Sequence, residues 1–229
     1  MSVIIISKGS YSHGGAVAER VSRKLNYGCF SRDILIDVSK KFNISELRLL
    51  RAVEDAPSFL EKYTFGRQKY IAYIRAAILE NLAKDNMVYH GFAGHFFIGD
   101  VSHVLKVRII ADMEQRLMYM MKREGVSREE AVRLVKKVDE ERTKWSVKLY
   151  GIDTWDSRLY DLVINIGKIT VDDAVDFICT VVNSKPFQTT PESQKQMDEL
   201  LRDAREKLKE VSLKPFFEPM RESPWSKKK

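Results

Sequence analysis

Residues 1–25, MSVIIISKGSYSHGGAVAERVSRKL, determine the fold that we expect for the whole chain. Residues 3–6 are a continuous apolar run, and residues 8–15 are rich in Gly and Ser. Apolar residues then recur at four-residue intervals, the helical period: Val17, Val21 and Leu25. We therefore expect a buried strand, a glycine-rich turn and a helix. This order brings backbone N–H groups and the positive end of a helix dipole to one point, which attracts phosphate.

The turn comes close to the phosphate-binding P-loop pattern, G-x-x-x-x-G-K-[ST]. Gly9 and Gly14 have the required separation, but Gly15 and Ala16 occupy the positions of the Lys and of the Ser or Thr. The missing Lys would contact the β- and γ-phosphates of a nucleotide, and the missing hydroxyl would bind Mg²⁺. A backbone cradle for phosphate can form without either group. Glycine-rich turns between a strand and a helix also occur for steric reasons alone, so the motif leaves both interpretations open.

The composition is that of a globular protein with an excess of positive charge. The chain has 229 residues, of which 44% are hydrophobic, and a formal net charge of +7 at pH 7. This length accommodates one α/β domain with insertions or two small domains. The basic balance suits an anionic ligand, nucleic acid or a membrane surface. Four of the positive charges lie in the tail, at Arg221 and residues 227–229, so the folded body is less basic than the total.

Two further features bear on the cellular location. Cys29 and Cys179 are far apart among apolar neighbours, so we expect buried thiols in a reducing cytosol, with neither a disulfide nor a metal site. The apolar run at residues 3–6 is too short for a signal peptide, and no run approaches the ~20 apolar residues of a membrane span. We therefore expect a cytoplasmic protein without a membrane partner.

Strand and helix patterns alternate along the rest of the chain. A turn at residues 26–30 leads into a short strand, and further strands are predicted near residues 87–91, 105–112 and 162–165. Helical patterns cover residues 34–42, 44–64, 68–84, 113–123, 127–142, 170–182 and 194–211. The alternation predicts a mostly parallel sheet covered by helices on both faces. Because Lys106 and Arg108 alternate with apolar residues, we expect the third of these strands to be less deeply buried.

Ligands bind such sheets outside the carboxyl ends of the strands. We therefore expect the 8–16 loop, the 91–95 loop and the segment after Asp112 to lie on one rim. His90 and His95 flank the 91–94 turn, but two His residues without a third ligand make a poor metal site. We accordingly predict no metal site built from protein side chains alone.

The order of these pieces resembles the cytidylate kinase-like branch of the nucleoside monophosphate kinases, which are P-loop α/β proteins. The resemblance rests on the Ser12–Gly15 loop with Val17 and Ala18, Arg32-Asp33, Gly91-Phe92-Ala93, residues 106–112 with Glu114 and Arg116, Ser127 with Glu130, Asp139 and Arg142, and residues 160–165. It implies a kinase-like domain over residues 1–183, with acceptor-side helices at about 31–85 and a lid at about 114–158. It also implies transfer of the γ-phosphoryl group of ATP, with Mg²⁺, to a nucleoside monophosphate such as CMP or dCMP.

The resemblance also implies roles for individual residues. The donor phosphates would lie on the loop formed by Gly9, Ser10, Tyr11, Ser12, His13, Gly14, Gly15 and Ala16. Arg116 and Arg142 would close over these phosphates from the lid. Asp33 would lie near the acceptor or the metal, and Arg75 is a candidate for the acceptor phosphate. Simpler alternatives remain open: the two lid arginines as solvated charges paired within helices, and Asp33 as a helix cap.

Several positions depart from the family pattern. Phe92 replaces an expected arginine, His13 replaces a loop glycine, and Gly15 and Ala16 provide neither Lys nor hydroxyl. Lys8 compensates only if its side chain folds back over the loop, and on that basis it is a candidate catalytic residue. A second interpretation of the same fold is therefore a sensor that binds nucleotide or phosphate without catalysis.

The region after residue 183 lies outside the resemblance. Residues 184–192 contain two prolines among polar residues and are interpreted as a linker, followed by an amphipathic helix at 194–211 and a basic tail. The apolar face of that helix could dock on its own domain or on a second copy of the chain, as a homo-oligomer. A nucleic-acid or protein interaction module is a third interpretation, less favoured because no nucleic-acid motif supports it.

Overall fold

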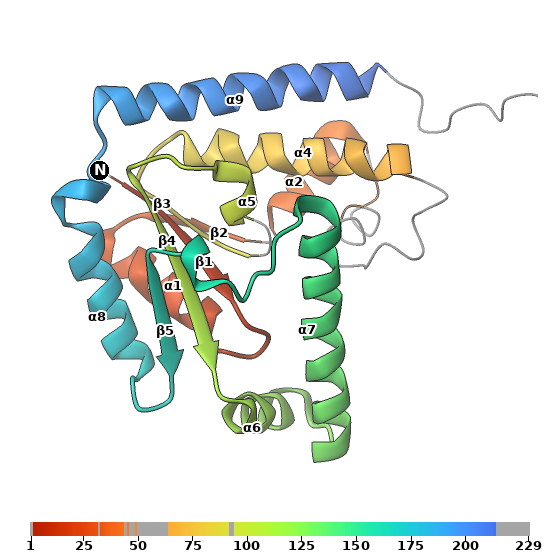
Figure 1. The fold of residues 1–229 in the computed structure, drawn as a ribbon, viewed down its shortest axis with the longest axis vertical. Coiled ribbons are helices and arrows are strands. Elements are labelled where there is room, and N and C mark those ends of the chain that lie inside the picture. The colour runs from red at the N-terminus through yellow and green to blue at the C-terminus, as the bar shows by residue number, and fades with distance from the viewer. Residues whose placement is uncertain are drawn as a thin grey trace, which may run out of the picture.

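The computed structural model describes residues 2–31, 33–43, 45, 49, 64–91 and 94–213 (Figure 1). Its centre is a five-stranded parallel sheet in the order β2-β3-β1-β4-β5. The strands are β1 (Val3–Lys8), β2 (Gly28–Phe30), β3 (Met87–His90), β4 (Val104–Ala111) and β5 (Leu162–Ile166). The predicted parallel sheet is confirmed. Most of the helix predicted at 44–64, together with Arg32, Phe92 and Ala93, lies outside the described residues.

The opening apolar run forms the middle of this sheet. Residues 3–6 are at most 1% exposed because helices cover both faces of β1. Side chains alternate between the faces, so Ile4 and Ile6 join one core and Ile5 joins the other. Ile6 lies opposite both His90 of β3 and Val107 of β4, so the carboxyl ends of these strands share one rim.

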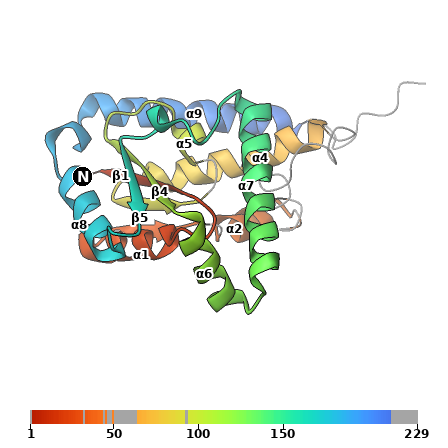
Figure 2. The same ribbon diagram turned by 60° about the horizontal axis from the view of Figure 1, so that its bottom comes forward.

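Helices form a layer on each face of the sheet (Figure 2). One layer consists of α1 (Gly14–Leu25) and α8 (Val171–Val182). The other consists of α2 (Ile34–Phe42), α4 (Thr64–Leu82), α5 (Gly94–Ile98) and α9 (Pro191–Ser212). At the rim stand α6 (Met113–Glu124) and α7 (Arg128–Tyr150), and short 3₁₀ helices occur at η3 (Ser157–Leu159) and η4 (Lys185–Phe187). No helix in the described part of the chain is long and apolar enough to cross a membrane.

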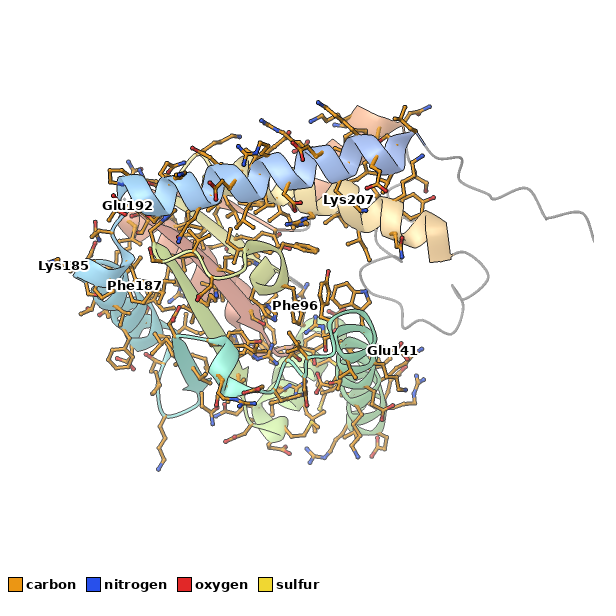
Figure 3. The ribbon with its side chains drawn as sticks, turned by 45° about the horizontal axis from the view of Figure 1, so that its top comes forward. Phe96, Glu141, Lys185, Phe187, Glu192 and Lys207 are labelled. Carbon is orange, nitrogen blue, oxygen red and sulfur yellow. The ribbon has the colours of Figure 1, made fainter. Side chains whose placement is uncertain are left out.

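The C-terminal helix belongs to the same core as the sheet. α9 runs along α4, as Figures 1 and 3 show, and its Met197 and Ala204 pack in the cluster that contains Ile5. The segment predicted as a linker contains η4 and a capping box between Thr190 and Ser193. Of the two alternatives stated for this helix, the structure shows docking on its own domain. The boundary at residue 183 and the homo-oligomer stay predictions.

The two helices of the predicted lid pack on each other and on the body. A small cluster formed by Leu117, Met120, Ala131 and Val135 joins α6 to α7. Near the C-terminal end of α7, Trp145 is fully buried and its ring contacts those of Phe96 in α5 and Tyr150. Trp145 and Tyr150 therefore pack the lid segment against the body. Trp155 differs, because its side chain is 50% exposed.

Two other predictions from sequence are wrong. Cys29 was expected to be buried, but it is exposed on the short strand β2, whereas Cys179 is buried as predicted. The strand containing Arg108 was expected to be less deeply buried, but β4 is an interior strand and Arg108 is only 7% exposed. Alternation of charged and apolar residues usually marks a solvated face, and here that face is covered by other elements.

Candidate functional site

The loop between β1 and α1 is anchored at the rim by a buried hydroxyl. Ser12 Oγ donates to the carbonyl oxygens of Gly9 at 2.9 Å and of Ile109 at 3.1 Å. The N–H of Gly9 also donates to Ile109 O at 3.0 Å. These bonds fix the loop to the end of the neighbouring strand β4. The loop conformation is therefore set before any ligand binds.

The fixed loop presents a row of unpaired backbone donors. Tyr11 and His13 have positive φ values of 56° and 62°, alternating with residues of negative φ, which produces the concave arrangement called a nest. His13 thus adopts the left-handed conformation that glycine favours. The N–H groups of residues 10–16 donate to no acceptor within the described part of the chain. Seven consecutive donors at a helix N-terminus form a site for an anion.

Lys8 folds back across the first turn of α1. A Cβ atom added to Gly14 would lie 2.6 Å from Lys8 Cβ, and one added to Gly15 would lie 3.4 Å from Lys8 Nζ. The ammonium group is therefore beside residue 15, the position of the lysine in the P-loop pattern. The geometric condition set for Lys8 from the sequence is met.

His90, at the end of β3, contacts the Lys8 ammonium. The distance from Lys8 Nζ to His90 Nδ1 is 3.4 Å. Burial, and secondarily the charge of Lys8, lowers the pKa of His90 to about 4, so the imidazole is neutral near pH 7. Nδ1 then accepts from the ammonium and Nε2 carries the ring proton. This pairing was not evident from the sequence, in which His90 only stood near the end of a predicted strand; the pairing of β1 with β3 brings it to Lys8.

Both predicted lid arginines reach the loop. Arg116, 4% exposed, donates from Nε to Ser10 O at 2.7 Å and from Nη2 to both carboxylate oxygens of Asp139 at 2.7 and 2.8 Å. Ser10 Oγ donates to Asp139 at 2.8 Å and contacts Arg116 Nη2. Arg142 Nη1 donates to Lys8 O at 3.1 Å. The interpretation of Arg116 as a solvated helix charge is wrong, because its ion pair joins α6 to α7 and to the loop.

The two predicted acceptor-side residues have different positions. Asp33 is exposed at the start of α2 and makes no side-chain cap bond, so the helix-cap alternative is not borne out. The negative charge of Asp33 raises the pKa of His90, so Asp33 lies on the His90 side of the loop. Arg75 instead pairs with Asp203 of α9 at 2.8 Å. Its predicted role at an acceptor phosphate gains no support from this contact.

A cavity of about 660 Å³ adjoins the loop. It is lined by His13, Gln115, Met118, Tyr119, Lys122, Arg123, Ile166 and Gly167. The rings of His13 and Tyr119 lie 4.1 Å apart at one side of it. Sequence reasoning missed this cavity because three distant segments, the loop, α6 and the end of β5, build it together. Within the described residues, no group of three His, Cys, Asp or Glu side chains is arranged to hold a metal ion.

Comparison with known proteins shows which proteins this chain is similar to. The chain is 26% identical to a cytidylate kinase of Sulfolobus acidocaldarius over 183 residues, covering 80% of this chain and 94% of that protein. It is also 26% identical to a cytidylate kinase of Pyrobaculum arsenaticum over 190 residues, covering 81% and 97%. A crystal structure of an uncharacterized protein from Eubacterium ventriosum shares the fold, with a TM-score of 0.62, 22% identity and coverage of 81% and 100%.

A family model agrees with the order of elements around the loop. The model of the cytidylate kinase-like family matches residues 3–168, from the first residue of β1 to just beyond β5. This match includes the loop, Lys8, His90 and both lid arginines. The chain belongs to the cytidylate kinase-like family.

Proposed function

We propose that this protein transfers the γ-phosphoryl group of ATP to a nucleoside monophosphate such as CMP or dCMP. The observation that carries the proposal is the row of unpaired N–H groups at residues 10–16, with the Lys8 ammonium folded over it. Phosphoryl transfer requires mainly positioning and neutralisation of negative charge. The fixed N–H donors of the loop would position the phosphates. Lys8 would supply the cation that the P-loop pattern places at residue 15.

The cations around the end of β1 support the same proposal. Lys8, Arg116 and Arg142 all contact the backbone or the first turn of the loop, and Asp139 is the carboxylate in this group. Their positive charge exceeds the negative charge of Asp139. Transferring phosphoryl groups develop negative charge on several oxygens, and cations held in place stabilise it without reorganisation.

The cavity beside the loop fits the base and sugar of the donor. Its volume of about 660 Å³ lies within the range of sites for ligands of nucleoside size. The aromatic rings of Tyr119 and His13 provide an apolar wall, and the amide of Gln115 provides a polar group for orientation. Because His13 belongs to both the loop and the cavity, one bound nucleotide would occupy both.

Mg²⁺ would enter this site with the nucleotide. The side chain at position 16 is a methyl group, so the loop provides no hydroxyl ligand, and Asp33 is the exposed carboxylate on the His90 side of the loop. Mg²⁺ is commonly held by substrate phosphates, water and one or two carboxylates, which this arrangement permits. When bound, the ion would neutralise phosphate charge. We also infer a cytoplasmic location, where ATP and nucleoside monophosphates are available.

A phosphotransfer assay with ATP, Mg²⁺ and a panel of nucleoside monophosphates tests the proposal, beside a calorimetric titration of ATP. We expect turnover with a pyrimidine monophosphate, in which an acceptor phosphate oxygen bonds to the γ-phosphorus and ADP leaves. Binding of ATP without turnover of any monophosphate would contradict the kinase activity and favour the sensor. Absence of both would leave only the shared fold.

A further inference from the structure

The face of β1 opposite Lys8 carries a second cation that the loop does not use. Ser7 and Arg108 are paired in register on β1 and β4, so their side chains lie on the same face of the sheet. Arg108 Nη1 donates to Ser7 Oγ at 2.7 Å. Arg108 makes no ion pair with a carboxylate in the described part of the chain, although the Tyr160 hydroxyl and the charge of Asp139 favour its ionised form, and its Nε has no hydrogen-bond partner there. At 7% exposure, a guanidinium in this state is costly to bury.

The imidazole of His95, near Arg108, is a second buried polar group without a hydrogen-bond partner in the described residues. His95 of α5 is also 7% exposed, and neither of its ring nitrogens has a partner within the described residues. Burial, followed by the charges of Arg108 and Lys106, lowers the pKa of His95 to about 3. The ring is therefore neutral near pH 7 and has one N–H donor unused. A buried polar group without a partner destabilises the fold.

Aromatic rings enclose these two groups. The Tyr160 ring centroid is 5.3 Å from that of His95 and 5.7 Å from the Arg108 guanidinium carbon. The Trp155 ring lies 5.4 Å from the same carbon, and its half-exposed side chain forms the wall toward solvent. Tyr160 Oη is held by donation to Thr154 O at 3.0 Å. Apolar surroundings strengthen any charge interaction made inside them.

We propose that Arg108 and His95 form an oxyanion subsite that binds the phosphate of the monophosphate acceptor. An oxyanion would accept from Arg108 Nε and from the free ring N–H of His95, which gives both unpartnered donors an acceptor. Entry requires displacement of the Trp155 side chain, the exposed element of the enclosure. Because Ser7 directly precedes Lys8, an acceptor held here would approach the donor phosphates from the opposite face of β1. The choice of acceptor rests on the proposed function.

Calorimetry on four variants tests the proposal with CMP as ligand. Arg108→Met removes the charge and keeps the stem, Arg108→Lys keeps the charge and removes Nε, and His95→Phe removes the ring donor. Arg20→Met is the matched control, because Arg20 pairs on the surface with Asp172. Since a hydrogen bond to a charged group is worth about 1.5–3 kcal/mol, we expect Arg108→Met and His95→Phe to weaken CMP binding by roughly 10- to 100-fold. Arg108→Lys should fall between wild type and Arg108→Met.

A comparison with cytidine separates phosphate recognition from a structural role. Affinity for cytidine, which lacks the phosphate, should be the same in wild type and variants. Folded Arg108→Met and His95→Phe proteins that bind CMP as tightly as wild type would overturn the proposal. An equal loss of CMP and cytidine affinity would also overturn it, because it would indicate damage to the site as a whole.

Nuclear magnetic resonance of the wild-type imidazole nitrogens covers the case in which these variants fail to fold. The His95 signals should shift on addition of CMP and remain unchanged with cytidine. A shift with inorganic phosphate but none with CMP would contradict the assignment to the acceptor. Failure of the kinase assay is a separate result, because CMP binding that depends on Arg108 would still support the subsite. If the protein is an active kinase but Arg108→Met leaves the KM for CMP unchanged, the subsite alone would be overturned.

Discussion

The two faces of the sheet at the end of β1 each carry a cation, Lys8 of β1 on one and Arg108 of β4 on the other, in different surroundings. On the α1 face, Lys8 lies beside a neutral imidazole acceptor at the open end of a helix. On the other face, Arg108 is enclosed by Trp155 and Tyr160, and the hydroxyls of Ser7 and Tyr160 are its hydrogen-bond partners. An ammonium can move on a flexible stem toward a ligand, whereas the guanidinium is held rigidly. The comparison indicates a mobile charge for the group being transferred and a fixed charge for the group that receives it.

Removing the mobile charge should have the largest effect on activity. We expect Lys8→Met to lower kcat/KM by about 10²–10³-fold, the usual cost of losing one preorganised donor to transition-state charge. The coupled phosphotransfer assay measures this effect. Lys24→Met is the control, because Lys24 also belongs to the α1 region but pairs on the surface with Asp176. Unchanged activity in Lys8→Met would remove Lys8 from the mechanism.

Displacing Lys8 without altering it should have the next largest effect. A methyl group in Gly14→Ala would lie 2.6 Å from Lys8 Cβ, near the backbone, so the whole side chain must move. In Gly15→Ala the methyl would approach only Nζ, at 3.4 Å, at the flexible end. We expect a loss of roughly 10-fold or more in kcat for Gly14→Ala and little loss for Gly15→Ala.

Stability provides the control for this pair of variants. Neither glycine has a positive φ, and alanine favours a helix over glycine by up to about 1 kcal/mol. Gly15→Ala should therefore melt at the same temperature as wild type or slightly higher. Equal activity in the two variants would show that the position of Lys8 over the first turn does not matter.

Acidification should destabilise the protein through a histidine on each face. The pKa values of His90 and His95 are lowered to about 4 and about 3, below the ordinary value of 6.5. At a pH between the ordinary and the lowered pKa values, the unfolded chain binds more protons than the folded one. The free energy of unfolding therefore falls as the pH falls from about 6.5 toward 4. Melting temperatures at pH 7.5, 6 and 5 would measure the slope.

Single variants would separate the two histidines. His90→Gln and His95→Phe should each reduce the dependence of melting temperature on pH, because one depressed group is removed in each. A slope that is the same in both variants and in wild type would mean that other groups control acid sensitivity. A change in only one variant would identify the histidine whose protonation is linked to unfolding.

The smallest effect is expected at Arg75, which lies away from both faces of β1. Its ion pair with Asp203 is partly exposed, and such pairs contribute about 0–1 kcal/mol. We expect Arg75→Ala to change stability by less than that and to leave the KM for the monophosphate unchanged. A KM raised tenfold would restore Arg75 as an acceptor ligand and weaken the case for Arg108.

The first twenty-five residues determined the core of the fold by themselves. A continuous apolar run, a Gly- and Ser-rich turn and a four-residue apolar period leave few arrangements other than a buried strand, a loop and a helix. The loop site followed from the same local pattern, since unpaired N–H groups at a helix start are a property of the backbone. The requirement that Lys8 fold back could also be stated in advance, because only a residue near position 15 can replace the missing lysine.

Only the tertiary structure decided which side chains stand beside that loop. Arg108 was expected on a solvated strand face, yet Trp155 before η3 and Tyr160 directly after η3 cover it. The pairing of Lys8 with His90 joins residues 82 positions apart. α9 likewise looked free until it packed on α4. In each case local periodicity reports the face on which a residue lies, whereas its neighbours depend on strand order and helix packing, which are properties of the whole chain.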